Sequence, residues 1–268
     1  ARVLSNNLSA GLFGAMVETA RMYGGGAVAV EDTVTGTLTR KRLLIGARVL
    51  GRRFAAITEP GEAVGVLLPN ANGAVVTFFG LQSGGRIAAM LNYTSGPANI
   101  ASAVRTAKIR TIVSSRAFIE KAELGDLVTA IDGTGAKILW LEEVRETIST
   151  QEKLEAALLW SRPLHPVKPE DAAVILFTSG SEGTPKGVVL SHRNLHSNAA
   201  QADARVTISV KDTLFNVLPV FHSFGLTGGT ILPLLFGVRL FLYPSPLHFK
   251  QIPQIAAKVK PTIMFGTN

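Results

Sequence analysis

The chain has 268 residues, 47% of them hydrophobic and 17% charged, which is enough apolar material to bury one large core or two smaller ones. Cysteine is absent, so disulfides and cysteine-ligated metal sites are excluded. The net charge of +8 favours an anionic partner, such as nucleic acid, an acidic protein, a membrane face or a nucleotide.

A basic segment comes early in the chain. Between Asp32 and Glu59 there is no acidic residue, and apolar residues recur at helical spacing among the cations. Those cations are Arg40, Lys41, Arg42, Arg48, Arg52 and Arg53. The pattern predicts a surface helix with a solvated basic face. A nucleic-acid-binding protein would also use such a face, but no recognition motif accompanies it, and we expect no nucleic acid partner.

Short apolar runs then alternate with helical patterns. The predicted strands are Val64–Leu68, Ile87–Met90, Ile109–Val113, Lys137–Leu141, Ala173–Phe177, Leu214–Leu218, Arg239–Leu242 and Thr262–Phe265. The predicted helices include Ala71–Leu81, Ala98–Ala107, Glu152–Trp160, Asn194–Ala204 and Phe249–Lys258. This alternation predicts an α/β fold in which parallel strands carry helices on both faces.

Two further segments have an unusual composition. Ser161–Asp171 holds three of the chain's prolines together with charged residues, and is the best linker candidate. Val217–Val238 has no acidic or basic residue and is long enough to span a bilayer. Its prolines, glycines and His222 favour a buried helix behind a pocket over a lipid-facing span.

A loop rich in glycine and hydroxyl residues follows the strand that ends at Phe177. Ligands of open α/β sheets bind beyond the carboxyl ends of the strands, which is where this loop lies. Glycines let backbone N–H groups approach an anion, hydroxyls donate hydrogen bonds, and a lysine could neutralise a departing pyrophosphate. The predicted phosphate-binding residues are Thr178, Ser179, Gly180, Ser181, Gly183, Thr184, Lys186 and Gly187.

Two other phosphate loops and a plain turn are the alternatives for this segment. A Walker A loop has Gly before its Lys and Ser or Thr after it, whereas Pro185 precedes Lys186 and Gly187 follows it. A dinucleotide fingerprint opens a helix, whereas this loop runs into the apolar residues 188–190. The length of the glycine and hydroxyl run after a buried strand disfavours a plain turn.

The loop Thr178–Gly187 resembles the signature loop of the adenylate-forming superfamily, which includes acyl-CoA synthetases, luciferases and peptide-synthetase adenylation domains. Other similar segments follow in the family's order along nearly the whole chain. They are Gly61–Asn70 (early strand), Gln82–Asn92 (second motif) and Leu218–Gly225 (aromatic-histidine motif). Ser181-Glu182, where the commoner loop has Thr-Thr or Thr-Gly, and Phe241–His248 look most like one branch. It is the synthetase half of the bacterial bifunctional acyl-[acyl-carrier-protein] synthetase/2-acylglycerophosphoethanolamine acyltransferases.

The resemblance implies the N-terminal part of the adenylate-forming fold, with two interleaved parallel-sheet lobes that carry helices on both faces. One lobe would take about residues 61–187, and the other about residues 1–60 plus 188–268. The family next places a Tyr-Gly-x-Thr-Glu motif and a small C-terminal domain that carries a hinge Asp and a catalytic Lys. Neither has a counterpart in this chain, so we expect the chain alone to be inactive.

The resemblance also implies where an acid would bind. The residues that would border the carboxylate and the acyl chain are Phe221, His222, Phe224, Gly225, Gly266 and Thr267. An imidazole could orient a carboxylate, and aromatic rings could exclude water from a mixed anhydride. Gly225, Gly228 and Gly229 would let a helix pack closely beside the ligand.

Three residues are assigned to catalysis, namely Thr178, Lys186 and His222, and Thr178 is the one predicted to lie near Mg²⁺. His192 and His196 have a metal-ligand spacing of one helical turn, but no third ligand is evident. We therefore predict that these two histidines are surface or capping residues.

The resemblance implies two half-reactions. A fatty carboxylate attacks the α-phosphorus of ATP and Mg-pyrophosphate leaves; the phosphopantetheine thiol of acyl carrier protein then attacks the acyl-adenylate. The expected cofactors are ATP and Mg²⁺, and a membrane surface is a candidate partner. The expected location is the cytoplasmic side of a bacterial inner membrane, or the cytoplasm. A long-chain fatty-acid–CoA ligase and a non-catalytic nucleotide-binding module remain alternatives.

Overall fold

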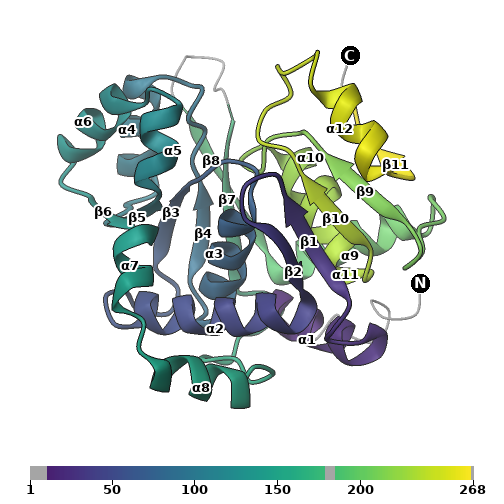
Figure 1. Cartoon of the computed structure of the whole chain (residues 1–268). Helices are drawn as coiled ribbons and strands as arrows, with labels where there is room; N and C mark the ends of the chain where they lie inside the picture. The colour runs from purple at the N-terminus through teal and green to yellow at the C-terminus, as the bar shows by residue number, and fades with distance from the viewer. Residues whose placement is uncertain (1–10, 179–184, 267–268) are drawn as a thin grey trace.

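The structure is a computed structural model that describes residues 11–178 and 185–266. Its strands form two sheets (Figure 1). The six-stranded sheet has the order β6 (Lys137–Trp140), β5 (Thr111–Ser114), β3 (Ala63–Leu67), β4 (Ile87–Met90), β7 (Ala172–Thr178), β8 (Lys186–Ser191). The five-stranded sheet has the order β11 (Ile263–Met264), β9 (Thr213–Asn216), β10 (Arg239–Leu242), β1 (Val28–Asp32), β2 (Gly36–Thr39).

Each sheet is parallel except for one edge strand. β8 runs antiparallel to β7, and β2 runs antiparallel to β1. Both exceptions follow a short connection, which can join antiparallel neighbours, whereas a parallel neighbour requires a longer crossover. The predicted α/β class, with parallel sheets and flanking helices, is confirmed, and β2 and β8 each add one antiparallel strand at the edge of a sheet.

Helices form three layers around the two sheets. Between the sheets lie α1 (Leu12–Tyr23), α2 (Arg40–Ala55), α3 (Asn72–Ser83), α9 (His192–Asp203), α10 (Ser223–Leu226), the π-helix η1 (Thr227–Ile231) and α11 (Leu232–Leu235). Outside the six-stranded sheet lie α4 (Pro97–Thr106), α5 (Arg116–Lys121) and α6 (Gly125–Asp132). Outside the five-stranded sheet lies α12 (Ile252–Val259). Two helices, α7 (Leu141–Thr147) and α8 (Thr150–Leu158), lead back from β6 toward β7.

The alternation of side chains along the strands separates these layers. In β7, Val174 and Leu176 join the core between the sheets, whereas Ile175 joins the core under α4 and α6. In β10, Leu240 and Leu242 face the central core, whereas Phe241 packs with α12. Because successive strand residues point to opposite faces, strands buried on both sides read as continuous apolar runs. The strands that are buried on both faces can therefore be recognised in the sequence.

The uncharged segment Val217–Val238 forms the loop that follows β9, then α10, η1, α11 and the turn before β10. Most of its residues are buried, in agreement with the predicted buried helix. In the described part of the chain, no helix is long and apolar enough to cross a membrane. The proline-rich segment connects α8 to β7, and the N–H groups of Leu164 and His165 donate to the Ser83 carbonyl at 2.7 and 3.0 Å.

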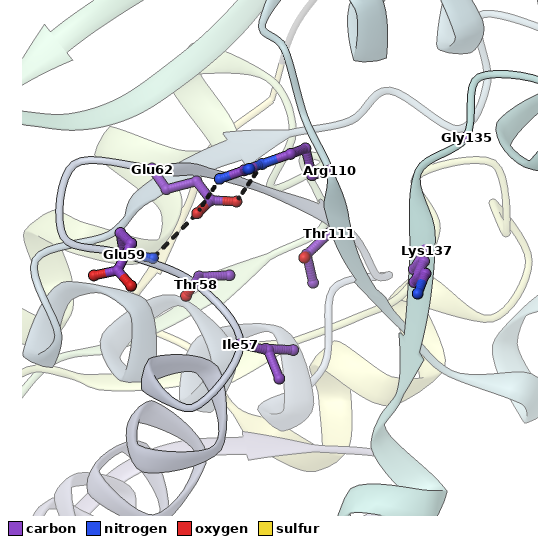
Figure 2. Close-up of a pocket in the computed structure, with 8 residues that line it drawn as sticks. All are labelled: Ile57, Thr58, Glu59, Glu62, Arg110, Thr111, Gly135 and Lys137. Carbon is purple, nitrogen blue, oxygen red and sulfur yellow. Dashed lines mark hydrogen bonds and ion pairs between the residues drawn. The ribbon is translucent and has the colours of Figure 1, made fainter.

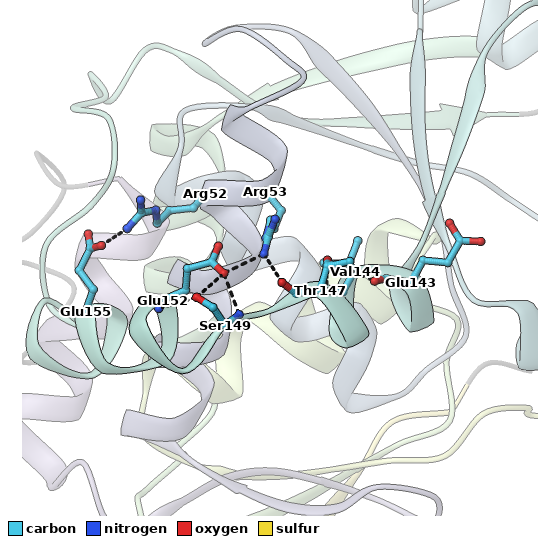
Figure 3. A network of polar contacts seen from close by, with 8 residues as sticks. All are labelled: Arg52, Arg53, Glu143, Val144, Thr147, Ser149, Glu152 and Glu155. Carbon is cyan, nitrogen blue, oxygen red and sulfur yellow. Dashed lines mark hydrogen bonds and ion pairs between the residues drawn. The ribbon is translucent and has the colours of Figure 1, made fainter.

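The basic helix differs from the prediction of a solvated cationic face. Arg40 and Arg48 of α2 are buried, and their guanidinium groups donate to backbone carbonyls. Arg52 pairs with Glu155, and Arg53 pairs with Glu152 at 2.8 Å, both on α8 (Figure 3). The acids that pair with Arg52 and Arg53 are far away in sequence, so the run of cations alone does not reveal them.

The two histidines of α9 are buried, so the prediction of surface or capping residues is wrong as to the surface, whereas His192 accepts a hydrogen bond from an N–H group at the start of α1 and so occupies a capping position. The Leu12 N–H donates to Nδ1 of His192 at 3.2 Å, so this ring joins the start of α1 to the start of α9. Burial and, to a smaller extent, the nearby His196 lower the pKa of His192 to about 4, against the opposing effect of Asp171. His192 is therefore neutral near pH 7, as an acceptor of an N–H bond must be.

Candidate active site

The base of the predicted phosphate loop is a pair of facing residues. Thr178 is the last residue of β7 and Lys186 the first of β8, and the antiparallel register places them directly opposite each other. Both side chains are exposed. A hydroxyl residue and a lysine thus lie opposite each other at the carboxyl end of β7, where open α/β sheets bind ligands.

Side chains alternate between the two faces of the sheet along β7, and this alternation shows which face Thr178 and Lys186 occupy. Thr178 has the same parity as Leu176, whose side chain belongs to the core between the two sheets. Residues directly opposite in an antiparallel pair point to the same face, so Lys186 shares it. The pair therefore faces the five-stranded sheet, which carries the predicted acid-binding residues.

Most of the residues that are predicted to bind the acid follow β9. Asn216 ends this strand and is buried; its Oδ1 accepts from the Leu218 N–H at 3.0 Å and its Nδ2 donates to the Gly225 carbonyl at 3.2 Å. These two hydrogen bonds connect both ends of the loop that follows β9 to the Asn216 side chain. The Phe221 ring is buried, whereas His222 is exposed at the N-cap of α10.

The ring of Phe224, two residues after His222, is exposed. It lies 5.1 Å from the ring of Phe265, the residue that follows β11. Gly266 comes next and is exposed. The structure thus brings the loop after β9 and the end of β11 together.

Two residues join this loop to the six-stranded sheet. Asn70, just beyond β3, donates to the Leu218 carbonyl at 2.8 Å and accepts from the Val220 N–H at 2.9 Å. Tyr93, just beyond β4, places its ring 4.8 Å from that of Phe221 in an edge-to-face arrangement. The carboxyl ends of β3 and β9 therefore meet, and β7 lies two strands from β3, roughly 10 Å away.

Asn70 and Tyr93 were not singled out from the sequence. Both lie in segments that resemble family motifs, and both follow predicted strands, which is the signal that could have found them. Burial raises the pKa of Tyr93 to about 12, so its hydroxyl stays protonated in neutral solution.

The glycines of this loop approach other protein atoms closely, in agreement with the expectation that they let a helix pack tightly at this place. A Cβ atom at Gly225 would lie 2.1 Å from the Pro219 carbonyl oxygen, and one at Gly229 would lie 2.6 Å from the Asn216 side chain. These glycines therefore allow α10 and η1 to close over the loop after β9.

A cavity of about 500 Å³ lies elsewhere, at the amino ends of β3, β5 and β6 (Figure 2). Glu62 accepts from Arg110 at 2.9 and 3.3 Å and from the Glu59 N–H at 3.1 Å, so two of the charged side chains on the cavity wall pair with each other. The cavity lies at the amino ends of these strands, whereas Thr178 lies at the carboxyl end of β7. We assign it no part in the candidate site.

Several predicted residues lie outside the described part of the chain. They are Ser179, Gly180, Ser181, Gly183, Thr184 and Thr267. Gly187, by contrast, lies in β8 opposite Phe177. Among the described residues there is no group of three or more histidine, aspartate or glutamate side chains that could hold a metal ion. We therefore assign no Mg²⁺ site to them.

Comparison with known families identifies the fold. Residues 16–268 match the model of the AMP-binding enzyme family. The chain belongs to the AMP-binding enzymes. Its similarity to a solved benzoate CoA ligase of Burkholderia xenovorans LB400 agrees with this. The TM-score is 0.81 at 19% identity, over 96% of this chain and 50% of that one.

Curated relatives of this AMP-binding enzyme include several acid–CoA ligases. It is 25% identical to 4-coumarate–CoA ligase 1 of Solanum tuberosum, over 84% of the chain and 40% of that protein. It is 27% identical to the medium/long-chain-fatty-acid–CoA ligase FadD6 of Mycobacterium tuberculosis, over 68% of the chain and 30% of that protein. The chain thus spans less than half the length of these relatives.

Proposed function

We propose that this chain is the ATP-binding part of an acid–thiol ligase that activates a fatty acid as its acyl-adenylate. One observation carries the proposal: Thr178 and Lys186 face each other at the carboxyl end of β7, on the side of the sheet that faces the loop of His222. Family membership supports the same reaction class, because AMP-binding enzymes join an acid to the nucleotide before transfer.

Each side chain has a distinct part in the proposed reaction. Lys186 neutralises charge on the departing pyrophosphate, and the Thr178 hydroxyl donates to a phosphate oxygen. His222 orients the attacking carboxylate from the other sheet. The rings of Phe221 and Phe224 border the acyl chain and exclude water from the mixed anhydride. Mg²⁺ would enter with the nucleotide, and we derive no step from it.

For the second half-reaction we propose the phosphopantetheine thiol of acyl carrier protein as acceptor, at the cytoplasmic face of a bacterial inner membrane. The Ser181-Glu182 variant and the segment Phe241–His248 support this branch, in which the whole protein would also carry a lysophospholipid acyltransferase. Coenzyme A is the second candidate acceptor, favoured by the similarity to the fatty-acid–CoA ligase FadD6. Offering palmitoyl-adenylate to each thiol in separate reactions distinguishes the two.

The nucleotide site is tested with the whole protein that contains these residues, by palmitate-dependent exchange of pyrophosphate into ATP. Lys186→Ala should slow exchange by about two to three orders of magnitude, because it removes one charge that stabilises the leaving group. Lys258→Ala is the matched control, since Lys258 is an exposed lysine on α12. Equal rates for Lys186→Ala and the native protein would refute the assignment.

A further inference from the structure

The turn between β3 and α3 is hydrogen-bonded to two separate segments of the five-stranded sheet. On one side, the Asn70 side chain binds the loop of His222, through the Leu218 carbonyl and the Val220 N–H. On the other side, Asn72 contacts the hairpin of β1 and β2. Both asparagines are buried. The turn therefore connects the hairpin to the loop of His222, although these two segments are distant in sequence.

Asp32, the last residue of β1, is the centre of the contact with the hairpin, and only 4% of it is exposed. One carboxylate oxygen, Oδ1, accepts from the Val34 and Gly36 N–H groups in the hairpin at 2.9 and 3.3 Å. The other oxygen, Oδ2, accepts from the Asn72 N–H at 2.8 Å. The Thr35 hydroxyl lies 3.0 and 2.9 Å from the two oxygens. One oxygen thus holds the hairpin turn, and the other holds the start of α3.

The start of α3 depends on this carboxylate because its own sequence supplies no cap. The first N–H groups of a helix have no acceptor within the helix, and the N-cap residue Ala71 has no side-chain acceptor to offer. Asp32 provides that acceptor from the other sheet, with a charge that suits a helix N-terminus. In return, Nδ2 of Asn72 donates to the Thr35 hydroxyl at 2.8 Å and to the Gly36 carbonyl at 2.7 Å. The hairpin therefore fixes the start of α3 and the turn just before it.

We propose that Asp32 and Asn72 are positioning residues, which hold the loop of His222 in place through the turn after β3. Their effect passes through Asn70, since this residue makes the hydrogen bonds to the loop. The proposal deepens the proposed function, on which its purpose rests. In that reaction His222 orients the carboxylate, so a shift of its loop disturbs the attack and leaves the nucleotide half of the site, with Lys186, unchanged.

The variant Asp32→Asn, made in the whole protein that contains these residues, separates the two contacts. Asparagine keeps one acceptor oxygen for the hairpin turn, but its NH₂ group cannot accept the Asn72 N–H. Hydrogen exchange at the Val220 amide should become at least about tenfold faster, because the loop is then held less firmly. In palmitate-dependent exchange of pyrophosphate into ATP, kcat should fall about tenfold while the KM for ATP stays unchanged.

The matched control is Thr58→Val, at the amino end of the six-stranded sheet. Thr58 is buried, and its hydroxyl accepts from Nε of Arg86 at 3.1 Å, so its removal also breaks a buried hydrogen bond. This variant should lower the free energy of unfolding without changing Val220 exchange or kcat. A second variant, Asn72→Ala, removes the bonds to Thr35 and Gly36 and should change Val220 exchange and kcat in the same direction as Asp32→Asn.

Native rates of Val220 exchange in Asp32→Asn would overturn the proposal, and so would equal acceleration in Thr58→Val. Faster Val220 exchange together with native kcat, in an active protein, would overturn the positioning role as well. If Asp32→Asn does not fold, Asn72→Ala decides by the same measurements. Because hydrogen exchange needs no catalysis, a protein without pyrophosphate exchange that still shows the faster Val220 exchange would refute the proposed function and support the link from the hairpin to the loop.

Discussion

Acidification from pH 7 to pH 4 should destabilise the contact between α1 and α9. The neutral His192 ring accepts the Leu12 N–H through Nδ1 at 3.2 Å in a buried setting, beside His196 and Asp171. In the folded chain its pKa is lowered from 6.5 to about 4, chiefly by burial. Protonation would put a charge in the core and remove the acceptor of the Leu12 N–H.

The magnitude follows from linkage between protonation and folding. Between about pH 6.5 and pH 4 the unfolded chain binds a proton at His192 and the folded chain does not. The free energy of unfolding therefore falls as the pH falls through this window, and the contribution is complete above it. A shift of one pKa unit corresponds to about 1.4 kcal/mol, so the loss is on the order of 3 kcal/mol.

The assay is urea denaturation across this pH range for the native chain and His192→Gln. Glutamine can accept the Leu12 N–H but does not titrate, so subtracting the two curves cancels the other titrating groups. The difference should change by about 3 kcal/mol between pH 7 and pH 4, in favour of the variant in acid. His196→Gln is the control, and it should keep most of the pH dependence because burial of His192 remains. Parallel curves for native and His192→Gln would refute the reasoning.

Two further predictions concern the loop of His222. Asn70→Ala should lower the free energy of unfolding by about 2 kcal/mol, since it leaves two buried backbone groups without a partner, and urea denaturation measures this. If Asn70 positions the loop, its variant should also lower kcat more than it raises the KM for ATP. Gly225→Ala should lower the melting temperature strongly because its Cβ would collide with Pro219, whereas Gly26→Ala, with open space around it, should not. Similar melting temperatures for both glycine variants would contradict the described packing.

Much of the fold could be predicted from the sequence because strands buried on both faces are continuous apolar runs. β7, with Val174 to Leu176 fully inside, is the clearest case. The sequence did not reveal the hairpin of β1 and β2 because its strands combine apolar with charged residues. Glu31 pairs with Arg239, and the Asp32 carboxylate accepts a hydrogen bond from the Val34 N–H in the turn. Neither acid can be recognised as a strand residue without its partner.

The environment of single side chains was less predictable. Arg48 reads as part of a basic face, but it is buried against the Arg162 carbonyl, which is distant in sequence. The sequence predicts that His192 is a surface or capping residue; it is buried, and the backbone N–H that it accepts comes from the start of α1. In both cases the deciding partner lies far along the chain, and local periodicity carries no information about such partners.

The candidate site has one half on each sheet, and this division bears on how it could work. Thr178 and Lys186 belong to the six-stranded sheet, and His222 belongs to a loop of the five-stranded sheet. In the proposed reaction, attack on the α-phosphorus needs the carboxylate and the nucleotide in line, so the two sheets would have to keep a fixed relation. Asn70 and Tyr93 provide direct links across the gap, through two hydrogen bonds and a ring contact. The alignment of the reactants therefore depends on residues that need touch neither of them.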